Sequence, residues 1–342
     1  MGSGVFSLMS NYSKNAGYGQ LQAILAQNGI SSFGKVLVVV EDSDTANYQR
    51  LQEIFDVDND GSVRFFSTLN AAYTAATSNA GDVILMSANS SHTITPFVWS
   101  KNRINVIGLD GGDRLVQQGT KVQNVTADTA AYVLKVTGVR NSFRNIKFIQ
   151  NSTNAAALSV VQMGGEGNLY KNCSFAFGVI DNLDQTDAFE VICGEDSGTF
   201  IDCTFGADTL LTSAARAVMS LDMVTANQEF KSNRFRGCTW IISSSSSTAT
   251  HIRLAAVTDI LFANVFENPV FVASVNTAGG AAIAESVQTG TGVNKGTLVF
   301  TNPCTFSSTD FATATGGRNA GIQIVGTVTT AGTSGIGVQP TA

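Results

Sequence analysis

The feature that most constrains the fold is a six-residue segment that recurs along the chain. Its copies are FRNIKF (143–148), YKNCSF (170–175), FIDCTF (200–205), FRGCTW (235–240) and LFANVF (261–266), with a weaker copy, TNPCTF, at 301–306. The first five copies start 27, 30, 35 and 26 residues apart. A period of about 20–50 residues indicates a solenoid, a propeller or another array of repeats. The chain is therefore expected to consist of stacked, similar units.

The sequence around these copies favours a parallel β-helix. From about residue 82 onward it consists of short β-rich runs broken by Gly, Asn, Asp or Ser, and nothing between the runs has the pattern of a regular helix. A period near 30 matches one coil of three short strands with turns. In such a fold each coil pairs with the next at about 4.8 Å, so that equivalent residues stack. The terminal aromatics of the repeat are then expected to form an internal column.

The fourth position of the repeat predicts a second internal column. It holds Ile146, Cys173, Cys203 and Cys238, with Cys304 in the weak copy. Buried free cysteines behave as small hydrophobic residues, so packing explains them without chemistry. A disulfide between Cys173 and Cys203 is the alternative, and the odd total of five cysteines argues against it.

The third position of the repeat predicts where each coil bends. It holds Asn145, Asn172 and Asp202, and then Gly237. Asn, Asp and Gly are the residues that tolerate the left-handed backbone conformation. A sharp bend between two strands of each coil is therefore expected at these positions.

Three regions are expected along the chain. They are a small α/β unit at 1–64, a β-helix at 65–310 and a Gly/Thr/Ser-rich segment at 311–342. At the start of the β-helix, Ser67 or Thr68 is placed to cap a short helix through Leu69 and Ala76. This helix is expected to plug the open end of the first coil, with Gly81 ending it and the strand 83–86 opening coil one.

The run STLNAAYTAATSNAGDVILMSANSSHTI, followed by KNRINVIGLDG, resembles the start of pectate-lyase-like right-handed β-helix proteins. The coils Asn145–Phe148 and Asn172–Phe175 resemble that superfamily as well. The resemblance covers roughly residues 65–270 and implies a mainly β fold, a right-handed parallel β-helix. Together with the N-terminal unit and the DxDxDG turn, this start is also similar to bacteriophage virion proteins. Because the shared motifs are structural, they imply a fold more directly than an activity.

Asp56, Asp58 and Asp60, followed by Gly61, match the first half of a calcium-binding loop. The twelfth position of such a loop should be a bidentate Glu, and here it is Ser67. That change removes two of the expected oxygen ligands. A solvated turn is therefore favoured over a calcium site, and calcium is the one cofactor that the sequence brings into question.

The acidic run DNLDQTDAFEVICGEDSG (181–198) offers candidate catalytic groups. Asp187 and Glu190 form its best pair for glycan cleavage by two carboxylates. The Asn-Thr-Asp, Asp-Asp and Gly-His-Gly signatures of the polygalacturonase relatives are absent, and the chain has only two histidines. Solvated loop carboxylates are the favoured interpretation. In HIRLAAV, alternation predicts His251 and Arg253 on one surface of a strand.

Composition limits the partners. The net charge is −6, only 13% of residues are charged, and no basic run is available to bind phosphates, so no nucleic-acid partner is expected. No stretch approaches about 18 consecutive apolar residues, so no membrane span is expected. The N-terminus lacks the pattern of a secretory signal, which favours synthesis in a host cytoplasm.

These observations lead to one expectation and two alternatives. We expect a non-enzymatic structural component of a bacteriophage particle, such as a capsid decoration, fibre or other shell protein. It would form a closed homo-oligomer, for which the phage-like resemblance implies a trimer, and would contact other virion proteins. The first alternative is a tailspike-like protein that binds or cleaves a surface glycan. A secreted carbohydrate-active enzyme is the second, and the missing signal disfavours it.

Overall fold

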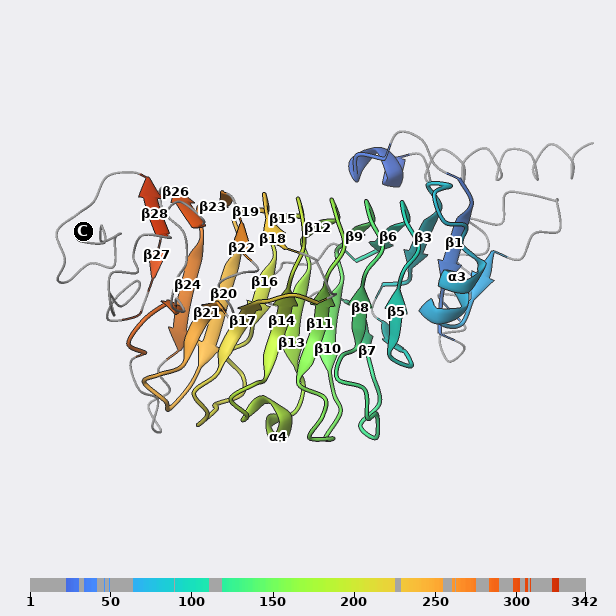
Figure 1. The fold of residues 1–342 in the computed structure, drawn as a ribbon. Coiled ribbons are helices and arrows are strands. Elements are labelled where there is room, and N and C mark those ends of the chain that lie inside the picture. Colours follow the sequence, from blue (N-terminus) through green and yellow to red (C-terminus); the bar gives the residue numbers. More distant parts are fainter. Residues whose placement is uncertain are drawn as a thin grey trace, which may run out of the picture.

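A computed structural model of the chain shows a long stack of short strands (Figure 1). The structure describes residues 23–30, 34–41, 46, 49, 64–88, 90–110, 119–224, 229–254, 260–261, 263–274, 283–288, 298–301, 305–306, 308 and 322–325. Among them, no helix is long and apolar enough to cross a membrane. Short helices accompany the strands, among them α3 (Leu69–Ala75) and α4 (Ile180–Leu183).

Three long sheets, A, B and C, run along the stack. Sheet A contains, in spatial order, β2 (Phe65–Phe66), β1 (Val36–Val39), β3 (Val83–Met86), β6 (Asn105–Gly108), β9 (Ser142–Arg144), β12 (Leu169–Lys171), β15 (Thr199–Ile201), β19 (Arg234–Arg236), β23 (Asn264–Glu267), β26 (Leu298–Thr301) and β28 (Ile322–Val325). Sheet B contains β4 (Ser90–Thr93), β7 (Thr120–Gln123), β10 (Lys147–Gln150), β13 (Ser174–Phe177), β16 (Thr204–Gly206), β20 (Thr239–Ser243), β24 (Val270–Ser274) and β27 (Thr305–Phe306). Sheet C contains β5 (Phe97–Trp99), β8 (Leu134–Val136), β11 (Ser159–Met163), β14 (Phe189–Cys193), β17 (Ala217–Leu221), β21 (Thr250–Leu254) and β25 (Val287–Gln288). A small fourth sheet pairs β18 (Phe230–Lys231) with β22 (Ile260–Leu261).

The strands of one coil visit the three sheets in turn, and each strand pairs in parallel with the strand one coil away. Along sheet A, for example, β9 pairs with β12 and β12 pairs with β15, in register. This is the predicted right-handed parallel β-helix, and the fold-class prediction is confirmed.

Two aromatic columns fill the interior. The terminal aromatics of the first four copies of the repeat form the sheet B column, as predicted, whereas Phe266, which ends the fifth copy, pairs with Phe235 in sheet A, so that copy was aligned out of register. In sheet A the column is Phe143, Tyr170, Phe200, Phe235, Phe266 and Phe300, with neighbouring ring centroids 4.3–5.4 Å apart. In sheet B it is Phe148, Phe175, Phe205, Trp240 and Phe271, with centroids 5.0–5.5 Å apart. Stacked rings in this range add to the stabilisation that comes from burying their area.

The cysteine column is confirmed as well. Cys173, Cys203 and Cys238 are fully buried and free, so the alternative Cys173–Cys203 disulfide does not form. Each thiol lies near a carbonyl of the preceding coil; the Cys203 Sγ, for example, is 3.4 Å from the Tyr170 oxygen. Cys304 lies outside the described residues.

The predicted bends adopt the left-handed conformation. The φ angles of Asn145, Asn172, Asp202 and Gly237 are 57°, 50°, 52° and 61°. Each of these residues lies in a two-residue connection between a sheet A strand and a sheet B strand. We call the edge that these bends form the A–B corner.

The capping helix is also present. Thr68 is the N-cap of α3, and its Oγ1 accepts a hydrogen bond from the Ala71 N–H at 3.2 Å. Leu69 and Ala72 are buried against the first coils. The turn after the helix contains Gly81 at φ 75°, and β3 follows directly.

The N-terminal and C-terminal regions contribute strands to sheet A. β1, from the region expected to form a separate unit at 1–64, pairs in register with β3. β28, from the segment 311–342, pairs with β26 of the same chain, so this strand does not need a partner subunit for pairing. Much of the region 1–64 lies outside the described residues, and the domain boundaries remain predictions.

Candidate functional site

The acidic run begins in the loop between β13 and β14, on the side of the molecule where α4 projects, and continues through β14 into the turn before β15 (Figure 1). Asp184 in this loop holds the next loop in place. Its carboxylate accepts hydrogen bonds from the Ser213 N–H and hydroxyl and from the Ala214 N–H. Burial raises the pKa of Asp184, but these hydrogen bonds outweigh it and leave the pKa below its ordinary value. This carboxylate therefore has a structural task.

Asp187 and Glu190, the predicted catalytic pair, contact different arginines. Glu190 is 2% exposed, and its carboxylate pairs with the guanidinium of Arg216, which is equally buried. The Asp187 side chain is 76% exposed, and its Oδ1 lies 3.3 Å from an Nη of Arg253. The fold therefore does not present the two carboxylates together to a substrate.

Burial gives Glu190 an unusual protonation behaviour. Desolvation raises its pKa to about 7, although the positive charge of Arg216 works in the opposite direction. The Arg216 Nε also points at the Ala188 carbonyl, at 3.4 Å. A buried carboxylate that is paired in this way has a structural role in the strand and is not accessible to a ligand.

Glu190 belongs to a row of buried positions that recurs along sheet C. The pairings of β14 with β11 and of β21 with β17 pass over Glu190 and His251 without a change of register, and the residues at the same positions of β11 and β17, Val160 and Val218, are buried as well. At His251 two successive N–H groups, those of His251 and Ile252, donate to the single carbonyl of Ser286. In these strands two consecutive residues are buried, so simple alternation does not place Glu190 and His251.

The structure corrects the prediction for His251. This residue was expected on the surface beside Arg253, but it is fully buried, and its ring lies 5.4 Å from that of Phe271. Burial lowers its pKa to about 4, so the ring is neutral at pH 7. A surface or catalytic role is therefore excluded for His251 in the folded chain.

The side chain of Arg253, on the outer face of sheet C, is held in place by several contacts. Its guanidinium lies 4.5 Å from the centroid of the Phe189 ring, and one Nη donates to the Thr186 carbonyl at 3.3 Å. Its neighbours in register along the sheet are, in coil order, Lys135, Gln162, Ile192, Ser220 and Gln288. This outer row, mostly polar, can donate and accept hydrogen bonds along the helix axis.

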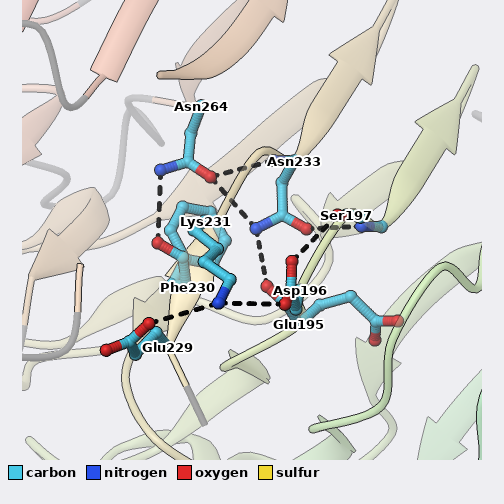
Figure 2. A network of polar contacts seen from close by, with 9 residues as sticks. Glu195, Asp196, Ser197, Glu229, Phe230, Lys231, Asn233 and Asn264 are labelled. Atoms are coloured by element: carbon cyan, nitrogen blue, oxygen red, sulfur yellow. Dashed lines mark hydrogen bonds and ion pairs between the residues drawn. The ribbon is translucent and has the colours of Figure 1, made fainter. Parts of the chain in front are cut away.

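A second polar system lies inside the turn from sheet C to sheet A. Asparagines directly precede four sheet A strands or begin them, and their side chains form a buried ladder: Asn141, Asn168, Asn233 and Asn264. Asn233, for example, lies between two coils: its backbone N–H donates to the Asn264 Oδ1 at 3.0 Å and its Nδ2 donates to the Glu195 carbonyl at 2.7 Å (Figure 2).

One coil of this ladder has Gly198 where the others have asparagine, and Glu195 fills the gap. A Cβ on Gly198 would lie 2.3 Å from the Cγ of Glu195. The Glu195 Oε1 accepts hydrogen bonds from both the N–H and the Nδ2 of Asn168, at 3.2 and 2.7 Å. Burial raises the pKa of Glu195 to about 8, so the side chain is largely a neutral acid at pH 7.

On the surface beside this ladder, Lys231 links two carboxylates. Its Nζ lies 3.3 Å from both Asp196 and Glu229, and Ser197 donates to Asp196 at 2.8 Å (Figure 2). These partly exposed pairs contribute little to stability.

Asp56, Asp58 and Asp60 lie outside the described residues, and calcium binding there remains a prediction. Within the part of the chain that the structure describes, no cluster of three or more His, Cys, Asp or Glu side chains is arranged to hold a metal ion.

No protein-family model and no curated protein sequence matches this chain. Among solved structures, it is similar to a pectin methylesterase from Aspergillus niger, at 12% identity over 88% of this chain and 93% of that one, with a TM-score of 0.45. Pectin methylesterase PemA from Erwinia chrysanthemi matches at 13% identity over 82% and 81% of the chains, with a TM-score of 0.39. ORF18 of Geobacillus virus E2 matches at 11% identity over 78% and 57%, with a TM-score of 0.34.

These comparisons contradict one prediction. The sequence led us to expect a protein without enzymatic activity, whereas the matching structures include enzymes, so that prediction is withdrawn. At 10–14% identity, the likeness transfers no activity or substrate to this chain.

Proposed function

We propose that this chain is a β-helical structural component of a bacteriophage particle. The observation that carries the proposal is the continuous, filled interior of the stack. Ring follows ring from Phe143 to Phe300 without a break in the sheet A column. Each coil therefore supports the next, as expected for a rod-shaped building block.

The surface composition supports the same role. Only 13% of the residues are charged, and Ser, Thr, Asn and Gly take their place. Contacts between such surfaces require little desolvation of ions, which favours close assembly. The sequence resemblance to phage virion proteins supports the proposal that this assembly takes place in a phage particle.

The composition of purified particles tests this proposal. Particles would be banded on a density gradient from cells that produce this chain, and their proteins quantified by mass spectrometry. We expect the chain to band with the particles in a fixed ratio to the major shell protein, after washing with salt. Its recovery in the soluble lysate alone would contradict the proposal.

A second function is favoured by the outer row of sheet C. Arg253 is held in place by Phe189 and Asp187, and polar side chains continue the row on neighbouring coils. A guanidinium placed over an aromatic ring is well suited to bind carboxylate and hydroxyl groups of a sugar chain. We propose that a surface glycan lies along this row.

Binding of an extracted bacterial surface glycan, measured by calorimetry, tests this second function. Arg253→Gln is expected to weaken binding about tenfold, because it removes one charge-assisted contact. Arg140→Gln, on the turn between β8 and β9, is the matched control and should bind as the unmodified chain does. Equal binding by all three proteins would exclude this face. The release of reducing ends or of acid in the same samples would reveal a catalytic activity.

A further inference from the structure

Four cations of neighbouring coils gather at the A–B corner. Lys121 and Lys147 are in register on sheet B, and Arg144 and Lys171 are in register on sheet A. The bend at Asn145 separates Arg144 from Lys147 by three positions in sequence. We call these four residues the basic corner. Because coils repeat at about 4.8 Å, like charges face each other at close range there.

None of the four cations has a carboxylate partner among the described residues. Arg144 is only 8% exposed, and the one side-chain contact of its Nε is the Ser142 hydroxyl at 3.5 Å. The pKa of Lys147 is lowered by burial and by the charge of Lys121. A partly buried cluster of unpaired cations is unfavourable alone and is relieved by an anionic partner.

The opposite edge of sheet B carries the complementary charge. The loops that lead from sheet B to sheet C contain Asp128, Asp181, Asp184, Asp187 and Asp208. The one cation in these described loops, Arg216, is buried and paired with Glu190. We call these five aspartates the acidic rim. Within this rim, Asp184 accepts hydrogen bonds from Ser213 and Ala214, Asp128 accepts one from the Val125 N–H, and Asp187 pairs with Arg253. Asp181 and Asp208 are therefore the aspartates to test.

The basic corner and the acidic rim lie at the same level along the axis. Lys121 and Asp128 belong to one coil, and Lys171 and Asp181 belong to another coil two steps further on. Between the two edges, sheet B presents no charge after Lys147, since the outward positions in register are Ser174, Thr204, Thr239 and Val270. Asp202, at the bend of the coil after Lys171, ends the basic corner.

From this arrangement we infer that the basic corner binds the acidic rim of a second copy of this chain. Two copies that lie side by side with parallel axes bring the two charged edges to the same height, with the uncharged part of sheet B between them. The contact joins two different surfaces, so it continues from copy to copy until a ring closes. The cross-section of the rod has three sides, and the two interacting edges lie at the two ends of one side, sheet B. Three copies can therefore close a ring in which each sheet B faces the ring axis. This inference does not depend on a virion role, and the composition of particles does not test it.

The test is the mass of the full chain in solution, measured by sedimentation at about 0.05 M and about 0.5 M salt. We expect an oligomer at low salt whose dissociation constant rises about tenfold or more at high salt, because screening weakens contacts between exposed charges. Lys121→Glu with Lys147→Glu should give monomers, and so should Asp181→Lys with Asp208→Lys. Mixing these two variants should restore association in strict alternation, since each supplies the edge that the other lacks, but the mixture should not form a ring of three, because an odd ring would bring two like edges together.

Lys135→Glu with Arg140→Glu is the matched control. It changes the charge by the same amount, but on sheet C and on the turn from sheet C to sheet A. It should assemble as the unmodified chain does, and urea unfolding checks that every variant is folded. Should a reversal fail to fold, Lys121→Gln with Lys147→Gln takes its place.

Several results would overturn the inference. A monomeric unmodified chain at every salt concentration is one, and an oligomer that withstands both charge reversals is another. A third is a monomer whose basic corner binds polyglutamate, because the partner would then be a different acidic polymer.

Discussion

At the scale of single residues, Glu195 shows how a side chain from a different position can complete a ladder. Gly198 leaves an empty place in the asparagine ladder, and the carboxyl group three residues earlier fills it. An asparagine amide is neutral, and a protonated carboxylic acid resembles it. The raised pKa of Glu195 therefore follows from its place in the ladder.

This replacement predicts a pH dependence of stability. The pKa of Glu195 is about 8 in the folded chain against an ordinary value of 4.5, so the folded state holds the proton more tightly. Its contribution is complete below about pH 4.5 and is lost as the pH rises toward 8, by on the order of 4 kcal/mol at most. Glu190 acts in the same direction up to about pH 7. The free energy of unfolding, measured with urea at pH 5, 6.5 and 8, should fall less steeply with pH for Glu195→Gln than for the unmodified chain. The same dependence on pH in both proteins would contradict this.

Gly198→Ala tests the packing of the same place. The added methyl group collides with the Glu195 Cγ, at 2.3 Å, and the surrounding ladder is buried. We expect a loss of about 1–3 kcal/mol in the free energy of unfolding, as for other overpacked interiors. The double variant Gly198→Asn with Glu195→Ala, which restores the regular ladder, should recover part of it. A neutral Gly198→Ala would show that this turn is not tightly packed.

The cysteine column gives a further prediction. Cys173, Cys203 and Cys238 are fully buried, and burial raises the pKa of Cys203 well above its ordinary value. All three should resist a thiol reagent until the chain is denatured, because the thiolate is the reactive form. Cys203→Ala should cost about 1–2 kcal/mol. Rapid labelling of the native chain would show that the column is open to solvent.

Most residues that repeat from coil to coil were predictable. The aromatic, cysteine and asparagine positions of the first four copies stack at one spacing, so one alignment places them. The fifth copy, LFANVF, was out of register, since Phe266 pairs with Phe235 and not with Trp240. Glu190 and His251 were misplaced, because alternation assigns neighbouring residues to opposite faces, whereas Glu190 is buried together with Val191 and His251 together with Ile252.

At the scale of elements, α3 closes the first coil through its C-terminal end. The Lys101 Nζ donates to the carbonyls of Tyr73, Thr74 and Ala76 at 2.7–2.8 Å. These are carbonyls that a helix end leaves without partners. The sequence predicted the helix and its Thr68 cap, because both signals are local. It gave no sign of Lys101, which belongs to a distant part of the chain.

Lys101→Met should therefore loosen the cap while keeping most of the apolar stem. We expect a loss of about 1–3 kcal/mol, since three carbonyls, two of them in partly buried contacts, lose a charged donor. Protease cleavage after α3 should become faster. The matched variant Lys135→Met lies on the outer face of sheet C and should leave stability unchanged within about 0.5 kcal/mol. Equal stability of both variants would exclude a capping role for Lys101.

At the scale of the whole molecule, each coil contacts only its neighbours, so the two ends decide how the stack terminates. α3 covers one end, and β28 adds a last strand to sheet A at the other. The repeat predicted that similar coils stack along the chain. It did not predict that β28 pairs within the chain, since the segment 311–342 holds no copy of the repeat.

Deleting residues 311–342 tests the C-terminal end. The deletion removes β28 and leaves the edge of β26 unpaired, and an unpaired edge invites pairing with other chains. We expect the shortened chain to form irregular, concentration-dependent aggregates, whereas the full chain gives one closed species in sedimentation. The substitution Ile324→Pro, which places a residue without an N–H inside β28, should have the same effect in milder form. A soluble, monomeric product after the deletion, with the same unfolding midpoint as the full chain, would show that β28 does not protect this end.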